Sequence, residues 1–244
     1  MSASPTATGS AGRAWFDLAR AGNFPSVVSN VVAALTLGAA GWPGPVEAAA
    51  VIVGGLFLYA GGATWNDVFD ADFDRKHRAE RAIPRGVVSR RAAAWGGSLE
   101  MSLGAALLAW AGAGWGWLAA LVATILAYDW LHKRWAGSVI LMAGCRVWLA
   151  LAVATRADER PSVEVLAWVG ALAAYIVLLS VLARWEYRPG APAARLGAAV
   201  GRLLAFIPAV DAAALLITGH PAAAMACLAA IPLGRWAQRL AAST

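Results

Sequence analysis

Carboxylate and amide side chains crowd one short stretch of the sequence, which reads N-D-V-F-D-A-D-F-D at positions 66–74. Asp67, Asp70 and Asp74 are three and four residues apart, so on a helix they share one face, with Asn66 beside them and Asp72 turned away. Like charges on one face repel each other unless a cation binds there. Oxygen ligands at this spacing suit Mg²⁺, which keeps some waters and is commonly completed by substrate phosphates.

Basic residues follow these acids directly, beginning with Arg75, Lys76 and Arg78 and continuing to Arg91. One interpretation is a solvated surface on which the acids simply pair with the neighbouring basic residues. The other is a metal site whose basic neighbours bind a diphosphate. The acids come at the end of an apolar run, where charges mark functional sites, and this position favours the metal–diphosphate site.

The composition predicts an all-α integral membrane protein. Of the 244 residues, 60% are hydrophobic and 14% charged, whereas a soluble domain has about 45–50% and about 25%. A helix needs about 20 apolar residues to cross the bilayer. Eight runs of that size predict a bundle of eight transmembrane helices, and seven or nine also fit. The runs are 24–41, 46–64, 92–111, 114–131, 137–155, 163–183, 198–218 and 221–240.

The predicted organisation is a single transmembrane domain over 23–244, preceded by a cytoplasmic tail over 1–22. The tail is expected to be disordered, with a short amphipathic piece that includes Trp15, Phe16 and Leu18 and that could lie on the membrane surface. No apolar stretch of signal-peptide length comes before Phe24.

The distribution of Lys and Arg predicts the orientation. With eight spans, nearly all basic residues fall on one side, which the positive-inside rule makes cytoplasmic. Both termini and the 66–74 stretch lie on that side of a multi-pass protein of the cell (inner) membrane. The net charge of +6 therefore reflects topology, and nucleic acid is not an expected partner. The residues on this side include Arg13, Arg20, Arg75, Lys76, Arg78, Arg81, Arg85, Arg90, Arg91, Lys133, Arg134, Arg184, Arg188, Arg195, Arg235 and Arg239, whereas Arg156 and Arg160 lie opposite.

The acidic stretch, followed by E-R-A-I-P-R-G-V-V-S at 80–89, resembles the first aspartate-rich motif of the UbiA superfamily of intramembrane prenyltransferases, N-D-x-x-D-x-x-x-D followed by a segment like R-P-I-P-S-G. The turn Y-D-W-L-H-K-R at 128–134 is similar to that family's Y-x-x-x-K-R element. The resemblance covers about residues 24–240. The N-D-V-F-D-A stretch and Gly144-Cys145-Arg146 also resemble a subgroup of small divergent members that includes the EboC proteins.

This resemblance implies a UbiA-like helical bundle and a Mg²⁺-dependent prenyltransferase. Its partners would be a prenyl diphosphate donor, a small-molecule or lipid acceptor, and membrane lipids. Mg²⁺ and basic side chains would stabilise the charge on the departing diphosphate. The resemblance implies metal and diphosphate ligands at Asn66, Asp67, Asp70 and Asp74, a diphosphate clamp at Lys133 and Arg134, and further substrate contacts at Arg81 and Arg85.

The sequence departs from the family pattern after the sixth span. Members usually carry a second motif, D-x-x-x-D, in that loop, but residues 184–195 contain one acid, Glu186. Glu186 is therefore a candidate substrate contact. Arg146 lies inside an apolar run, where an arginine is costly unless it faces a polar cavity or a partner. It could bind a phosphate directly, or it could be satisfied by Glu186, Asp129 or a backbone carbonyl.

The sequence excludes two other classes of enzyme and leaves one alternative function open. A CDP-alcohol phosphatidyltransferase needs D-G-x-x-A-R, but Asp70 is followed by A-D-F-D-R. Soluble terpene synthases use D-D-x-x-D, and the composition excludes a soluble bundle. A more serious alternative is a catalytically impaired UbiA-like protein that binds or moves an isoprenoid lipid within a biosynthetic assembly. The reduced second motif favours that alternative, whereas the complete first motif and the basic clamp favour the enzyme.

Overall fold

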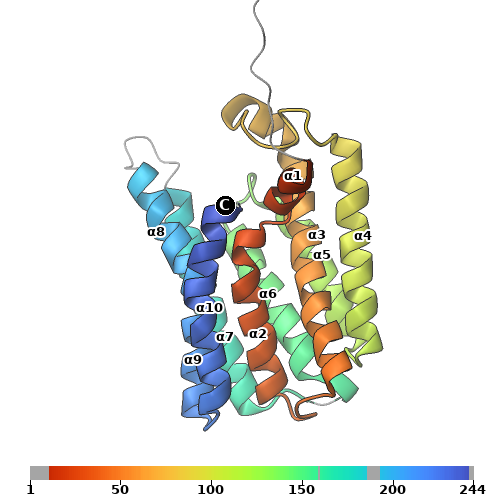
Figure 1. Ribbon diagram of the computed structural model, residues 1–244, viewed down its shortest axis with the longest axis vertical. Helices are drawn as coiled ribbons and strands as arrows, with labels where there is room; N and C mark the ends of the chain where they lie inside the picture. Colours follow the sequence, from red (N-terminus) through yellow and green to blue (C-terminus); the bar gives the residue numbers. More distant parts are fainter. Residues whose placement is uncertain (1–10, 159, 186–192, 242–244) are drawn as a thin grey trace, which may run out of the picture.

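The computed structural model describes residues 11–158, 160–185 and 193–241, and this part of the chain is helical throughout apart from its turns and connecting segments. The helices pack side by side as a bundle (Figure 1). In chain order they are α1 (Ala11–Leu18), α2 (Phe24–Leu37), α3 (Pro45–His77), α4 (Arg90–Trp110), α5 (Trp115–Leu131), α6 (Ser138–Ala154), α7 (Val163–Trp185), α8 (Ala193–Ala205), α9 (Ile207–Ile217) and α10 (Pro221–Leu240), with short 3₁₀ turns at Ala21–Asn23 and Arg156–Asp158.

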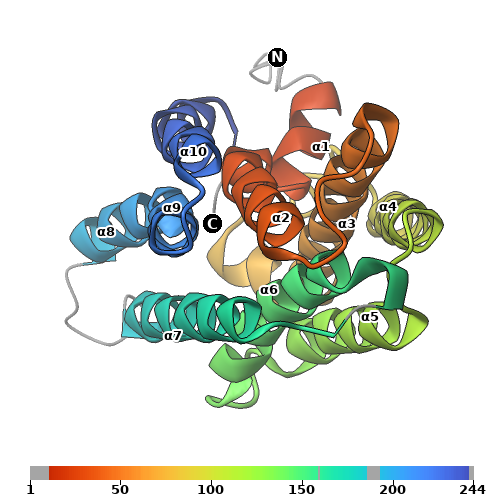
Figure 2. The same ribbon diagram turned by 90° about the horizontal axis from the view of Figure 1, so that it is seen from below.

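Helices α2 and α6 lie inside the bundle, with the other long helices around them (Figure 2). Their side chains are correspondingly buried: Val27, Val31 and Leu35 of α2 and Leu149 of α6 belong to one continuous apolar core. This arrangement leaves the outer helices to form the outer surface of the bundle.

Glycines allow α3 and α4 to pack closely. A side chain at Gly104 would place its Cβ 2.7 Å from the carbonyl oxygen of Gly54, and one at Gly61 would come 2.8 Å from the carbonyl oxygen of Gly97. Small residues let helix backbones approach each other where no hydrophobic force drives them together. This contact fixes α3, which carries the acidic stretch.

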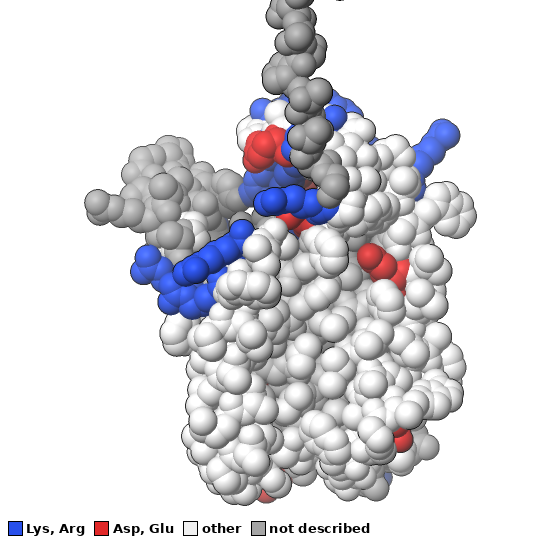
Figure 3. Space-filling view, viewed as in Figure 1, with Lys and Arg blue, Asp and Glu red and all other residues white. Residues whose placement is uncertain are grey.

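The outer surface has the composition of a membrane protein. Large apolar side chains face outward, among them Trp95, Leu178 and Ile217. In the described residues, the segments Pro45–His77, Val163–Trp185 and Ala199–Ile217 are long and apolar enough to cross a membrane. Charged side chains gather mainly at one end, above a body that is largely uncharged (Figure 3). We call this the charged end; α1, the last turns of α3 and the end of α10 all lie there.

The predicted all-α bundle is therefore confirmed, with two differences in the helices. The second predicted span ends at residue 64, but α3 continues without a break to His77, since no Gly or Pro interrupts it after Gly62. The acidic stretch is thus the end of a helix. The seventh predicted span is divided at Phe206 into α8 and α9 because Pro208, the second residue of α9, cannot donate a backbone hydrogen bond to continue the preceding helix.

The amphipathic piece predicted before the first span is also helical. In α1, Ala14 and Leu18 are buried against Val68 and Ala71 of α3. The described part of the tail, residues 11–22, thus contains this helix and the start of a 3₁₀ turn in place of the disorder expected around the amphipathic piece, while residues 1–10 lie outside the described part. Packing of α1 on α3 places the chain immediately before α2 next to the acids.

Candidate functional site

Three acids point inward from the last turns of α3, at the charged end. Asp67, Asp70 and Asp74 have exposed fractions of 6%, 5% and 1%. Asp72 lies on the opposite face, exposed, with Arg75 and Arg90 as surface partners. The one-face arrangement predicted from the spacing is confirmed. We call Asp67, Asp70, Asp74 and the basic side chains that contact them the acidic cluster.

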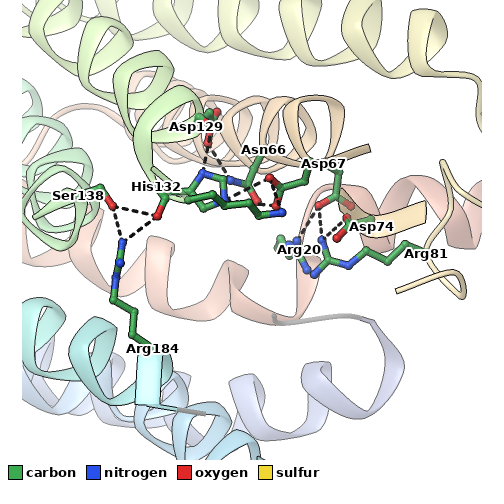
Figure 4. Close-up of polar contacts among 11 residues, drawn as sticks. Arg20, Asn66, Asp67, Asp74, Arg81, Asp129, His132, Ser138 and Arg184 are labelled. Atoms are coloured by element: carbon green, nitrogen blue, oxygen red, sulfur yellow. Dashed lines mark hydrogen bonds and ion pairs between the residues drawn. The ribbon is translucent and has the colours of Figure 1, made fainter. Parts of the chain in front are cut away.

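Two arginines from outside α3 bind the first and last of these acids (Figure 4). Arg20 Nη2 lies 2.7 Å from Asp67 Oδ1, and Arg81 Nη1 lies 2.8 Å from the same oxygen and 3.1 Å from Asp74 Oδ2. Arg20 has a left-handed backbone with φ of 52°, a conformation that non-glycine residues rarely adopt and that often marks functional sites. Burial, followed by the charge of Arg20, lowers the pKa of Arg81.

The segment 78–89 carries Arg81 back over α3. Gly86 adopts a φ of 72°, which glycine reaches without steric cost. Ile83 and Val88 then pack in the small apolar cluster that also contains Leu18. The apolar side chains of this segment therefore hold Arg81 above the acids.

The turn after α5 supplies the cation for the middle acid. Lys133 Nζ lies 2.8 Å from Asp70 Oδ1 and 3.5 Å from the centre of the Phe73 ring, and His132 Nε2 lies 3.3 Å from Asp70. This turn is tied to α7, because Arg184 Nη2 donates to the His132 carbonyl oxygen at 2.9 Å and to Ser138 Oγ at 2.6 Å (Figure 4).

Asn66 and Asp129 join α3 to α5 beside the acidic cluster. Asn66 Nδ2 donates to Asp129 Oδ1 at 3.1 Å, and Asp129 is 4% exposed. Two buried carboxylate oxygens here, Asp74 Oδ1 and Asp129 Oδ2, have no hydrogen-bond partner in the described structure. Buried polar atoms are nearly always paired, so these two oxygens call for an explanation, such as a bound ion or water.

These donors fit Mg²⁺, provided that the substrate completes its coordination. Among the described residues, no three carboxylate, imidazole or thiol groups are arranged to hold a metal ion by themselves. Mg²⁺ needs only one or two protein carboxylates when waters and phosphate oxygens supply the rest. The unpaired oxygens of Asp74 and Asp129 suit a hard cation, and the surrounding basic groups suit a diphosphate.

The structure brings together some predicted site residues and not others. Asn66, Asp67, Asp70, Asp74, Arg81 and Lys133 all lie in or beside the acidic cluster. Arg85 is exposed, and Arg134 is exposed and stacks on Trp130 with its Cζ 5.5 Å from the ring centre. Among the described contacts, none joins either arginine to the acidic cluster, and a substrate contact for them stays a prediction. Glu186 lies outside the described residues.

Arg146 lies deep in the bundle in a polar group that we call the inner network. Its Nη1 donates to Asn30 Oδ1 at 2.7 Å and its Nη2 to Ser26 Oγ at 3.1 Å. Asn30 donates in turn to both carboxylate oxygens of Asp211, which also accepts from Ser29 Oγ and Trp168 Nε1. Arg146 Nη1 also donates to the Ser26 carbonyl oxygen at 3.3 Å, which confirms the predicted contact with a backbone carbonyl. Glu186 lies outside the described residues, and the described contacts of Arg146 include neither Asp129 nor a place for a phosphate.

Sequence reasoning missed Arg20 and Asp129 as members of the site. In the sequence, Arg20 is one of several basic residues before the first apolar run, and nothing distinguishes it from them. It contacts Asp67 because α1 packs on α3. Asp129 did carry a signal, since an acid at the end of an apolar span is costly without a partner.

Comparisons with known proteins identify the family. The UbiA prenyltransferase family model matches residues 27–167. Digeranylgeranylglyceryl phosphate synthase of Thermococcus kodakarensis is 43% identical over 76 residues, which cover 30% of this chain and 27% of that protein. The enzyme of the same name from Thermococcus gammatolerans is 48% identical over 48 residues, covering 20% and 17%. The matches thus span about a quarter or less of these relatives.

A solved structure described as digeranylgeranylglyceryl phosphate synthase in membranes shares the fold, with a TM-score of 0.56 and 12% identity. The superposition covers 94% of this chain and 95% of that one. Because the family model covers more than half of the chain and includes the acidic stretch, the chain belongs to the UbiA prenyltransferase family.

Proposed function

We propose that the protein is a Mg²⁺-dependent intramembrane prenyltransferase that moves an isoprenyl group from a prenyl diphosphate to an acceptor. The observation that carries this proposal is the acidic cluster, in which three inward-facing carboxylates share one side of α3 and each contacts a basic side chain from another segment. Both kinds of group that a metal–diphosphate requires are thus present in one place.

The acidic and the basic residues of the cluster have different proposed roles. Asp67, Asp70 and Asp74 would hold Mg²⁺, which neutralises charge on the leaving diphosphate when it is bound. Arg20, Arg81 and Lys133 now neutralise the acids and would bind diphosphate oxygens once a metal takes over the carboxylates. Their charges stabilise the leaving group more than the substrate, because negative charge concentrates on the diphosphate as the allylic bond breaks.

The apolar bundle below the acidic cluster would take the prenyl chain. Exclusion of water matters here, since an allylic cation reacts with water as readily as with the acceptor. By the positive-inside rule we place the charged end, with the site and both termini, at the cytoplasmic face of the cell membrane.

The names of the two Thermococcus relatives suggest which substrates to test first. They contain a geranylgeranyl group and a glyceryl phosphate. We propose geranylgeranyl diphosphate as the first donor and a prenylated glycerol phosphate as the first acceptor, followed by shorter and longer donors and by aromatic acceptors.

The test uses the full chain in proteoliposomes with Mg²⁺, the donor panel and the acceptor panel. We expect release of diphosphate that requires both an acceptor and Mg²⁺. A protein that binds prenyl diphosphates in a metal-dependent way but forms no product with any acceptor would contradict the enzyme and favour the lipid-binding alternative. The observation that favours that alternative is the presence of a single acid, Glu186, in residues 184–195, where family members usually carry two aspartates.

A further inference from the structure

Asp129 lies beside the acidic cluster, and within the described chain no salt bridge joins its carboxylate to a basic side chain. Its Oδ1 accepts a hydrogen bond from Asn66, and its buried Oδ2 has no hydrogen-bond partner among the described residues. Asn66 comes directly before Asp67 on α3, so this hydrogen bond holds the Asp129 carboxylate next to the acids of that helix. Figure 4 shows Asp129, Asn66 and Asp67 in one group.

Asp129 is a carboxyl group additional to the three acids that have basic partners. Asp67, Asp70 and Asp74 are contacted by Arg20, Arg81 and Lys133, three acids with three permanent cations. Asp129 adds a fourth carboxyl group, and its Oδ1 accepts a hydrogen bond from the neutral amide of Asn66. A buried carboxyl group keeps a charge only where a cation lies close to it, and the buried Oδ2 of Asp129 has no hydrogen-bond partner among the described residues. A metal bound there would supply that cation.

We propose that Asp129 is a fourth carboxylate ligand of the Mg²⁺–diphosphate site, contributed by α5 opposite the acids of α3. The inference rests on the proposed function and adds a residue that the acidic stretch does not contain. His132 supports the placement: its Nδ1 lies 3.0 Å from the Asp129 carbonyl oxygen and its Nε2 3.3 Å from Asp70. The end of α5 is therefore held against the acidic face of α3 at two points.

A site with ligands on two helices has a consequence for binding. The metal can engage Asp129 and the α3 acids together only while α3 and α5 keep their packing, so metal binding should stabilise the fold. The reverse also holds: without Asp129, metal binding should be weaker and should raise the melting temperature less.

The experiment measures binding of Mn²⁺ with inorganic diphosphate to the purified full chain, by electron paramagnetic resonance and by thermal unfolding. The variants are Asp129→Asn, Asp129→Glu and the control Glu100→Gln. Glu100 is also a partly buried acid, but its partner is Thr64 of α3, at 3.1 Å. We expect Asp129→Asn to weaken Mn²⁺ binding by about tenfold or more, Asp129→Glu to weaken it less, and Glu100→Gln to leave it unchanged.

Thermal unfolding without metal separates ligation from packing. Asparagine has the shape of aspartate and keeps an acceptor for Asn66, so Asp129→Asn should melt at the same temperature as the wild type or higher. A lower melting temperature without metal would overturn the inference, since the carboxylate would then serve packing. So would Mn²⁺ binding equal to that of the wild type.

The same measurements distinguish failure of the proposed function from failure of the role proposed for Asp129. If the wild type binds no Mn²⁺ with diphosphate, or if Asp70→Ala binds as well as the wild type, the proposed function itself is wrong. If Asp70→Ala abolishes binding while Asp129→Asn binds normally, only the role of Asp129 is wrong.

Discussion

Two buried polar groups in this molecule contain aspartate and arginine and differ in how completely their atoms are paired. In the inner network, both oxygens of Asp211 accept hydrogen bonds, from Ser29, Asn30 and Trp168. At the charged end, Asp74 and Asp129 each have a buried oxygen with no partner in the described structure. Complete pairing is typical of groups that stabilise a fold, whereas unpaired buried atoms call for an explanation, such as a bound ion or water.

The difference also concerns which elements the two groups join. The inner network connects α2, α6, α7 and α9 in the middle of the bundle. The acidic cluster connects α3 to the segment before α2, to 78–89 and to the turn after α5. Turns and segments outside the packed helices adjust more easily than helices in a core, which suits side chains that must exchange an acid for a substrate.

The largest effect on stability is expected in the inner network. Asp211→Leu removes the acceptor for three donors and leaves Arg146 without a nearby acid, which should cost about 3–5 kcal/mol. Chemical denaturation in detergent measures this loss. Adding Arg146→Met should recover part of it, because the two residues are coupled through Asn30. Weaker Mn²⁺–diphosphate binding at unchanged stability would contradict this separation of roles.

Replacing an aspartate of the acidic cluster should lower the activity, whereas replacing Asp211 of the inner network should lower the stability. Asp70→Ala removes a proposed metal ligand and the partner of Lys133, so the rate of diphosphate release should fall by about 100-fold or more. The matched control is Asp72→Ala on the exposed face of the same helix, which should stay within about twofold of the wild type. Equal rates for the two variants would show that the inward-facing acids have no special role.

An intermediate effect is expected at Arg184, which holds the turn that carries Lys133. Arg184→Ala should raise KM for the donor by about tenfold with a smaller change in kcat, because Lys133 is less well positioned while the metal ligands remain. Steady-state kinetics measures both constants, and Arg184→Lys should restore part of the loss. An unchanged KM would show that the turn keeps its place without this tether.

The smallest effect is expected for two exposed arginines that the family resemblance includes in the site. Arg85→Ala and Arg134→Ala should each change the rate by less than about twofold, since exposed charges contribute little. In the same assay, Lys133→Ala should lower the rate far more than either of these variants. If Arg134→Ala lowered the rate as much as Lys133→Ala, Arg134 would belong to the diphosphate clamp after all.

Much of the fold follows from the sequence, because the apolar runs required by the bilayer coincide with the long helices. The common face of Asp67, Asp70 and Asp74 follows from helical spacing alone. The break at Phe206 and the extension of α3 to His77 depend on backbone effects weaker than the apolar pattern. Partners far apart in the sequence could not be predicted. The approach of Arg20 to Asp67 requires α1 to pack on α3, and the Arg146–Asn30 bond requires α6 to face α2.

Binding of geranylgeranyl diphosphate to the purified protein tests the central claim most directly, and it should be measured with Mg²⁺, with EDTA, and for Asp67→Ala with Mg²⁺. Asp67 is contacted by both Arg20 and Arg81, so its removal affects metal and diphosphate binding together. The account predicts binding by the wild type with Mg²⁺ and its loss both on adding EDTA and in Asp67→Ala. Equal binding in all three conditions would contradict the assignment of a metal–diphosphate site to the end of α3.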